Sequence, residues 1–255
     1  MGRVVIFIYG IACYVLFFLT FLYLIAFVGN LGTLPFVTKT IDSGTPGPLG
    51  QALLVNLSLI ALFAVTHTVM ARPWFKEKWT KIVPPAAERS TYVLVSSLAL
   101  ILLYREWVPM TDTVWNVTDP AGATVLWVLY FAGYGIVLVS TLLINHFHLF
   151  GLSQVFAHLR QSPLPGVRFV EPVLYKVVRH PLYVGWIMAF WATPNMTSGH
   201  LLFAAGLTAQ ILISIPYEER DIEEALGQPY RDYKGRTPML VPFLKSRRKA
   251  PLPDL

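Results

Sequence analysis

Four long apolar runs dominate this sequence and restrict what it can fold into. They cover Val4–Val28, Gly50–Ala71, Ser90–Val108 and Thr124–Asn145. A helix that crosses the hydrocarbon core of a bilayer needs about 20 such residues. The composition agrees, because only 13% of the 255 residues are charged, whereas soluble domains carry about 25%. We therefore expect a polytopic membrane protein in which each run forms a transmembrane helix.

The first run also resembles a secretory signal peptide in position, but not in length. The apolar core of a signal peptide is about 7–15 residues and ends at a small-residue cleavage site. Val4–Val28 is longer and has no such site after it, so we expect it to be retained. Cys13 lies inside this run, where we interpret it as a small buried hydrophobic residue.

A fifth apolar region, residues 182–216, is interrupted near its middle. Thr193-Pro194-Asn195 and Ser198-Gly199 are turn-forming residues, and they leave two halves of roughly 12 to 17 residues, short of the ~20 that span a bilayer. This pattern predicts a helical hairpin that enters the bilayer and returns. A single kinked span is the alternative interpretation.

The distribution of positive charge separates these two alternatives. With a hairpin, 18 of the 20 Lys and Arg residues fall on one side of the membrane, and only Lys39 and Arg105 lie near the other. Cytoplasmic loops carry an excess of Lys and Arg, so the sequence predicts that both termini are cytoplasmic, in an inner (cytoplasmic) membrane. The net charge of +6 is accounted for by these flanking residues, and it predicts no nucleic-acid partner.

The expected fold class is therefore all-α, a polytopic transmembrane bundle of five to six membrane segments. The last two segments form the hairpin, and a cytoplasmic amphipathic segment follows. We expect one domain over residues 1–244. Residues 245–255 form a basic, proline-containing tail, which is expected to contact anionic lipid.

The hairpin begins with a motif that suits ligand binding. Arg179 and His180 precede Pro181, and proline is favoured in the first turn of a helix. The free N–H groups of such a helix start favour an anion. The alternative is that Arg179 and His180 only anchor the hairpin to lipid headgroups.

The hairpin ends at Ile215–Arg220, which should lie at the same depth as its beginning. The sequence therefore predicts that Glu218 and Glu219 lie close to Arg179 and His180. This places a guanidinium, an imidazole and two carboxylates from distant stretches of chain together at the cytoplasmic face.

The chain after the hairpin is expected to form a short amphipathic helix, Asp221–Leu226, ended by Gly227. Tyr230 and Tyr233 follow at helical spacing. The acidic residues of this stretch are expected on a solvated helix face; they are Asp221, Glu223 and Glu224.

Two histidines lie at the cytoplasmic ends of predicted spans. His67 is about one turn inside the second span, and His146 follows the fourth. A neutral imidazole can act as a general base near pH 7, although most such histidines are core groups with satisfied hydrogen bonds. His146-Phe147-His148 has metal-ligand types but no carboxylate nearby in sequence, and we expect no metal centre. Axial ligation of a haem by His67 and His146 is a further alternative.

The C-terminal half resembles a known family. The pattern is Arg179–Gly185, about 30 apolar residues, Glu218-Glu219, then Tyr230–Tyr233 and Arg236–Pro238. In this order it is similar to the membrane-integral methyltransferases, which include isoprenylcysteine carboxyl methyltransferase. Further segments resemble a bacterial branch that contains methanethiol S-methyltransferase and denitrification-associated membrane proteins; they are Thr66–Arg72, Phe75-Lys76, Glu88–Leu94 and Asn145–Leu152.

The resemblance implies S-adenosyl-L-methionine as methyl donor and a small thiol as acceptor, with methanethiol giving dimethyl sulfide. Another thiol or a prenylcysteine carboxylate is the alternative acceptor. The family's cofactor pocket maps onto Tyr175, Val178, Arg179, His180, Tyr183, Glu218, Tyr230 and Tyr233. This chain departs from the family in the loop before Arg179, where Leu174-Tyr175 replaces the usual Gly-Pro-Tyr.

For the catalytic step, thiolate is the reactive form of a thiol. We expect His146 or His67 to act as base and Arg179 or His180 to hold the cofactor carboxylate. Rival functions are a haem- or quinone-binding membrane subunit and a transporter. A transporter predicts polar residues at mid-membrane, whereas those found here gather at one face.

Overall fold

The computed structural model describes residues 2–164 and 169–244. Within them, five helices are long and apolar enough to cross a membrane. These are α1 (Arg3–Val28), α2 (Leu49–Met70), α4 (Pro85–Glu106), α5 (Pro120–Ile144) and α10 (Ser198–Leu226). The first four coincide with the four predicted runs to within a few residues at either end. The prediction of an all-α membrane bundle is confirmed, and the predicted tail at 245–255 lies outside the described residues.

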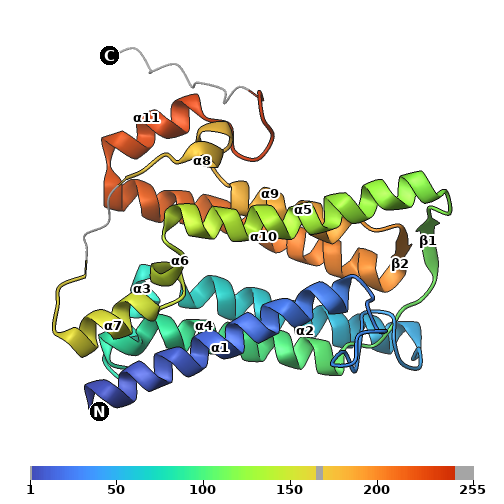
Figure 1. Cartoon of the computed structure of the whole chain (residues 1–255), viewed down its shortest axis with the longest axis horizontal. Coiled ribbons are helices and arrows are strands. Elements are labelled where there is room, and N and C mark those ends of the chain that lie inside the picture. The colour runs from blue at the N-terminus through green and yellow to red at the C-terminus, as the bar shows by residue number, and fades with distance from the viewer. Residues whose placement is uncertain (1, 165–168, 245–255) are drawn as a thin grey trace.

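The helices form two layers (Figure 1). One layer contains α1, α2 and α4, and the other contains α5, α10 and the shorter α9 (Pro181–Trp191). Short helices gather at the end of the molecule where α1 begins and α10 ends; they are α3 (Pro73–Trp79), α6 (His146–Leu149), α7 (Leu152–Arg160), α8 (Val173–Val177) and α11 (Gln228–Arg236). The predicted site residues 175–180 and 230–233 lie at this end.

Local sequence fixes where several helices start. Pro85, Pro120 and Pro181 each stand in the first turn of their helices, where the missing N–H costs no hydrogen bond. The carboxylate of Asp119 accepts from the Gly122 backbone N–H (2.7 Å) and caps α5. The hydroxyl of Thr197 caps α10 in the same way.

The predicted hairpin is present, but its turn is built from extended chain. An 11-residue helix such as α9 is roughly 16 Å long, about half of the hydrocarbon thickness. The following chain forms strand β2 (Asn195–Thr197), which pairs antiparallel with β1 (Thr113–Asn116) from the α4–α5 connection. The pairing gives this extended backbone hydrogen-bond partners, which it would need inside a membrane, and the ribbon lies at the far end of the molecule from the short helices (Figure 1).

The second arm of the hairpin is longer than expected. Helix α10 continues through Pro216 to Leu226 and is capped by Gly227, so the predicted separate helix Asp221–Leu226 is its last part. A proline inside a helix removes one backbone hydrogen bond at a cost of about 3 kcal/mol. Side-chain bonds of Glu218 and Glu219, just after this proline, hold the continuation in place.

The two apolar helices α5 and α9 approach at a pair of glycines. A Cβ added to Gly133 would lie 2.7 Å from the backbone oxygen of Gly185, and a Cβ on Gly185 would lie 2.7 Å from that of Gly133. Small residues at such contacts let membrane helices approach closely. The pair sets the position of α9, which begins at the predicted site.

We expect Gly133→Ala to lower the free energy of unfolding by about 1–3 kcal/mol, since overpacking against a rigid backbone carries that cost. Gly135→Ala is the matched control, because a Cβ there meets no atom within 4 Å. Thermal unfolding in detergent compares them. Equal unfolding temperatures for the two variants would show that this contact does not hold α9.

Candidate active site

Arg179, His180 and Glu219 form a buried charged cluster at the start of α9. Arg179 Nε donates to Glu219 Oε1 at 2.7 Å, and His180 Nε2 lies 3.0 Å from the same oxygen. All three residues are at most 8% exposed. The hairpin thus brings residues 39 and 40 positions apart into contact, as the sequence analysis predicted.

This cluster also fastens α11 and the chain after it. Arg179 Nη1 donates to the backbone oxygens of Lys234 (3.2 Å) and Thr237 (2.5 Å). The Arg179 backbone N–H donates to Pro238 O at 2.8 Å. Lys234 Nζ lies 3.3 Å from Glu219 Oε2. Arg179 is therefore bonded mainly to protein groups, and it holds α11 and the chain after it against the start of α9. We call the residues of α8 to α11 at this end of the molecule the roof of the site.

The predicted tyrosines pack in the same roof. The Tyr233 hydroxyl donates to Tyr175 O at 2.7 Å, and the ring of Phe169 contacts both Tyr230 and Tyr233. Burial, followed by the nearby carboxylate of Glu171, raises the pKa of Tyr233 to about 12. Burial also raises the pKa of Tyr230 and of Tyr175. These phenols are therefore neutral at physiological pH. Val178, another predicted cofactor-binding residue, is buried.

The side chain of Glu218 does not join the cluster around Glu219, and it bonds to Tyr183 instead. Tyr183 OH donates to Glu218 Oε2 at 2.6 Å, and the Tyr183 ring stacks on His180 with centroids 5.4 Å apart. Both Tyr183 and Glu218 lie within electrostatic range of Tyr92, which belongs to the other layer. Glu218 thus faces the space between the layers.

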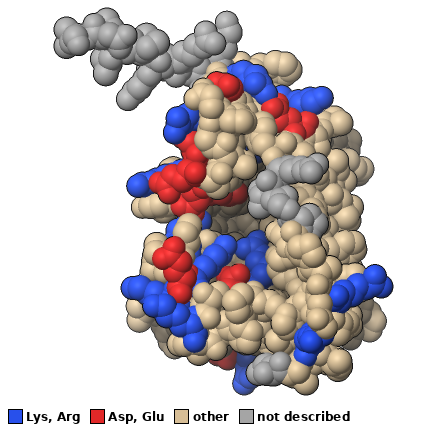
Figure 2. All heavy atoms as spheres, turned by 90° about the vertical axis from the view of Figure 1, so that its left-hand side faces the viewer, with Lys and Arg blue, Asp and Glu red and all other residues tan. Residues whose placement is uncertain are grey.

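A hollow opens between the two layers at this end of the molecule, with acidic and basic side chains around it (Figure 2). We call it the interlayer cleft and define it by Arg72, Tyr92, Tyr183, Glu218 and Asp221. Arg72 Nη1 and Asp221 Oδ2 bridge the layers at 2.7 Å, with side chains 14% and 29% exposed. Asp221, which we expected on a solvated helix face, is therefore partly exposed and is paired across the two layers.

We call the residues of α2, α3 and α4 at this end of the molecule the floor of the cleft. The floor carries further cationic groups. The Arg89 guanidinium lies over the ring of Tyr92, 4.9 Å from its centroid. Lys76 lies within electrostatic range of Arg72, Arg89 and Asp221. Burial, followed by Arg89, lowers the pKa of Lys76. The cleft therefore presents positive groups on its floor and the Glu218 carboxylate on its roof.

The two candidate bases lie in different surroundings. The ring of His67 contacts Tyr92 OH (3.0 Å from Nδ1) and Ser96 Oγ (3.3 Å), which places it at the cleft floor. His146 bonds to Tyr14 OH (2.8 Å) and Thr141 Oγ1 (2.9 Å). Among the residues that the structure describes, none of the hydrogen bonds of His146 reaches a predicted cofactor-binding residue.

His146 instead lines a small cavity of about 20 Å³ between α1 and α5, together with Phe17, Phe21 and Phe150. This volume holds about one water molecule. Both ring nitrogens of His146 already have partners, so its geometry is that of a structural group joining α1 to α5.

This arrangement makes stability depend on pH. Burial lowers the pKa of His146, so the unfolded chain, with a value of about 6.5, takes up the proton first as pH falls. The stabilisation is present above that value and is lost below it. We expect the unfolding temperature to fall from pH 7.5 to 5.5, and to fall less in His146→Gln. An equal fall in both proteins would contradict this role.

Several residues of the candidate site were not predicted from the sequence. Arg72 and Asp221 are 149 positions apart, and no sequence pattern pairs them. Tyr92 and Arg89 stand in a segment that resembled the bacterial branch, which was the available signal. No group of three or more His, Cys, Asp or Glu side chains that could hold a metal ion occurs in residues 2–164 and 169–244.

Comparison with known proteins identifies the family. The family model described as NnrU protein matches residues 55–243, most of the chain and all of the interlayer cleft. The chain belongs to the NnrU family. The NnrU match spans both the floor residues on α2 and α4 and the roof residues on α9 to α11.

The chain is also similar to proteins of nearly equal length. Methanethiol S-methyltransferase from Mycobacterium tuberculosis is 49% identical over 243 residues, which cover 95% of this chain and 98% of the relative. The enzyme of that name from Crocosphaera subtropica is 44% identical over 244 residues, 96% and 94% of the two chains. Nurim from Bos taurus is 27% identical over 229 residues. No solved structure matches the chain.

Proposed function

We propose that this membrane protein transfers a methyl group from S-adenosylmethionine to methanethiol, forming dimethyl sulfide. The observation that carries the proposal is the near full-length similarity, 44 to 50% identity, to relatives named methanethiol S-methyltransferase. The chemistry requires a donor site in contact with the cytoplasm and an apolar position for a small thiol. The interlayer cleft is our candidate for the donor site, because it is a hollow at one end of the molecule with charged side chains around it. The long apolar helices beside it would provide the apolar position for the thiol.

The charges of the cleft fit the proposed donor. S-adenosylmethionine carries a carboxylate, an ammonium group and a ribose with two hydroxyls, and it supplies an electrophilic methyl group on a cationic sulfur. Lys76 lies within electrostatic range of Arg89 and Arg72, and also of Glu88 and Asp221. The net positive charge of this group would favour the donor carboxylate. Glu218 accepts from Tyr183 at 2.6 Å on the roof and retains acceptor sites for an ammonium or hydroxyl group.

The buried cluster has a supporting role in this proposal. Arg179, His180 and Glu219 bond to one another and to the chain after α11. They position Tyr183, whose ring stacks on His180, and so fix the roof against which the cofactor would lie. Accurate positioning supplies much of the rate of a displacement reaction.

Of the two candidate bases, the geometry favours His67. Its ring contacts Tyr92 on the cleft floor, whereas His146 bonds to Tyr14 on α1 and to Thr141 on α5, away from the predicted cofactor-binding residues. His67 would accept the thiol proton, directly or through Tyr92, so that thiolate attacks the methyl carbon. The bond between that carbon and the sulfonium sulfur would break, and S-adenosylhomocysteine would leave. Arg179, the third predicted catalytic residue, acts by positioning in this scheme.

The orientation follows from charge. Arg72, Arg89, Arg179 and Arg220 stand at the end of the molecule that holds the cleft, and the bias of 18 of 20 Lys and Arg residues favours the cytoplasmic side. We propose that the cleft opens to the cytoplasm from the inner membrane, with both termini on that side.

The test is a headspace assay on purified protein in detergent. With S-adenosylmethionine and methanethiol we expect dimethyl sulfide, and His67→Ala should reduce the rate by about 10²–10⁴-fold if it is the base. A prenylcysteine analogue serves as the competing acceptor. Methylation of that carboxylate, with no dimethyl sulfide from methanethiol, would overturn the proposed acceptor.

A further inference from the structure

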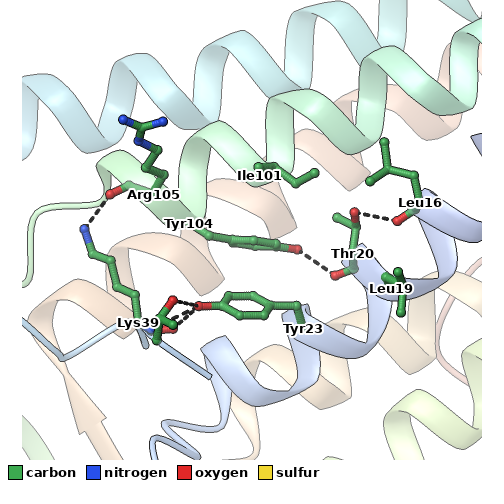
Figure 3. Close-up of a pocket in the computed structure, with 9 residues that line it drawn as sticks. Leu16, Leu19, Thr20, Tyr23, Lys39, Ile101, Tyr104 and Arg105 are labelled. Atoms are coloured by element: carbon green, nitrogen blue, oxygen red, sulfur yellow. Dashed lines mark hydrogen bonds between the residues drawn. The ribbon is translucent and has the colours of Figure 1, made fainter. Parts of the chain in front are cut away.

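Another cavity lies at the opposite end of the bundle from the interlayer cleft. It has a volume of about 560 Å³ and runs between α1 and α4 on the outside of the molecule (Figure 3). Its lining residues are Leu16, Leu19, Thr20, Tyr23, Thr38, Lys39, Ile101, Tyr104 and Arg105. We call it the outer groove. The proposed methyltransferase chemistry uses none of these residues.

The outer groove has a polar end and an apolar end. Helices α1 and α4 both run away from the cleft end, so residue order along them gives depth in the membrane. Leu16 and Leu19 lie deepest on α1, and Ile101 lies deeper than Arg105 on α4. Leu16 to Tyr23 spans about 10 Å along the helix axis. The groove is therefore apolar toward the bilayer centre and polar at its surface.

The polar end is organised by hydrogen bonds. Tyr23 OH accepts from the Lys39 backbone N–H (3.0 Å) and donates to Lys39 O (2.9 Å), which folds the loop after α1 back along that helix. Lys39 Nζ donates to Arg105 O at 2.7 Å. These bonds hold the Lys39 ammonium over the mouth of the groove (Figure 3).

The mouth of the groove carries the two cationic side chains of this face, Lys39 and Arg105, among the residues that the structure describes. Both residues line the same groove. Arg105 Nε pairs with Glu106 Oε1 at 3.2 Å, and its side chain is 82% exposed. With Glu106 counted, the mouth carries one net positive charge.

We propose that the outer groove binds an anionic phospholipid of the leaflet opposite the active site. The phosphate would lie between Lys39 and Arg105, and an acyl chain would run along Leu16, Leu19 and Ile101. Helices α1 and α4 are long and apolar enough to cross a membrane, and Leu19 beside the groove is 57% exposed, so lipid would be the solvent that fills this space. Tyr23 and Tyr104 border the groove at the level where tyrosines meet the membrane surface.

Native mass spectrometry of the purified, delipidated protein tests this inference. With added phosphatidylglycerol we expect one retained lipid, held at least about tenfold more tightly than phosphatidylcholine, since each cation near a lipid surface contributes to binding. The double variant K39A/R105A should lose that preference. The matched control K78A/K81A removes two exposed cations from the other face and should keep it.

A second variant separates the acyl chain from the headgroup. Leu19→Trp fills the groove and leaves both cations in place, and it should also weaken phosphatidylglycerol by about tenfold. Glycerol phosphate, which lacks acyl chains, should not compete. Unchanged lipid retention in both K39A/R105A and Leu19→Trp, equal loss in K78A/K81A, or full competition by glycerol phosphate would overturn the proposed lipid site. Dimethyl sulfide formation is measured separately, so failure here leaves the enzymatic proposal untouched.

Discussion

Glu219→Ala is expected to destabilise this protein by about 3–5 kcal/mol and to abolish methyl transfer. The Glu219 carboxylate receives Arg179 Nε at 2.7 Å and lies 3.0 Å from His180 Nε2 and 3.3 Å from Lys234 Nζ. Its removal leaves a guanidinium that is 8% exposed without its counter-charge, and breaking a buried pair on one side carries that cost. The chain after α11 would also lose its attachment to α9.

The measurement is thermal unfolding in detergent beside the dimethyl sulfide assay. Glu224→Ala is the control, because Glu224 pairs with Arg220 on the surface, with side chains 63% and 78% exposed. Exposed pairs contribute about 0–1 kcal/mol, so this variant should behave as wild type. A Glu219→Ala protein as stable as Glu224→Ala would show that the buried cluster does not support the roof.

Glu218→Ala is expected to abolish detectable binding of S-adenosylmethionine while leaving the fold intact. Glu218 is partly exposed and accepts one bond, from Tyr183 OH at 2.6 Å. The variant therefore leaves no buried charge unpaired, unlike Glu219→Ala. A charge-assisted hydrogen bond to a ligand is worth about twice a neutral one, and truncating one partner of a buried pair costs about 2–5 kcal/mol of binding. We expect affinity to fall at least about 100-fold.

Calorimetric titration with S-adenosylmethionine measures this loss. Tyr183→Phe is the companion variant, since it removes the hydroxyl but keeps the ring that stacks on His180. It should weaken binding by less than Glu218→Ala. Wild-type affinity in Glu218→Ala would remove this carboxylate from the cofactor site.

The sequence predicted the membrane segments well because their signal is local. Each span is a continuous apolar stretch, and α1, α2, α4 and α5 agree with those stretches. The hairpin was also predictable, because turn residues at 193–199 and the charge bias both required a return. That return was enough to bring Arg179 and His180 to Glu219.

Features that depend on contacts between distant elements were not predictable. The β1–β2 ribbon joins Thr113 to Thr197, and neither short segment carries a strand pattern of its own. Helix α10 continues past Pro216 because contacts of its later residues outweigh the local cost of proline. The Arg72–Asp221 bridge, which joins the two layers at the cleft, could not be predicted without knowing that α2 packs beside α10.

The histidines illustrate the same limit. Their positions at the same end of two spans are equivalent in sequence, yet His67 contacts Tyr92 in the cleft and His146 contacts Tyr14 on α1. Depth in the membrane is readable from sequence, but the direction in which a side chain points around the helix depends on packing.

Ultraviolet cross-linking of radiolabelled S-adenosylmethionine, followed by peptide mapping, tests the central claim most directly. If the interlayer cleft binds the cofactor, label will appear in peptides that contain Tyr183, Glu218 or Tyr92, and Glu218→Ala will remove it. Label confined to peptides around Tyr14 and His146, or unchanged by Glu218→Ala, would place the cofactor elsewhere and contradict the account.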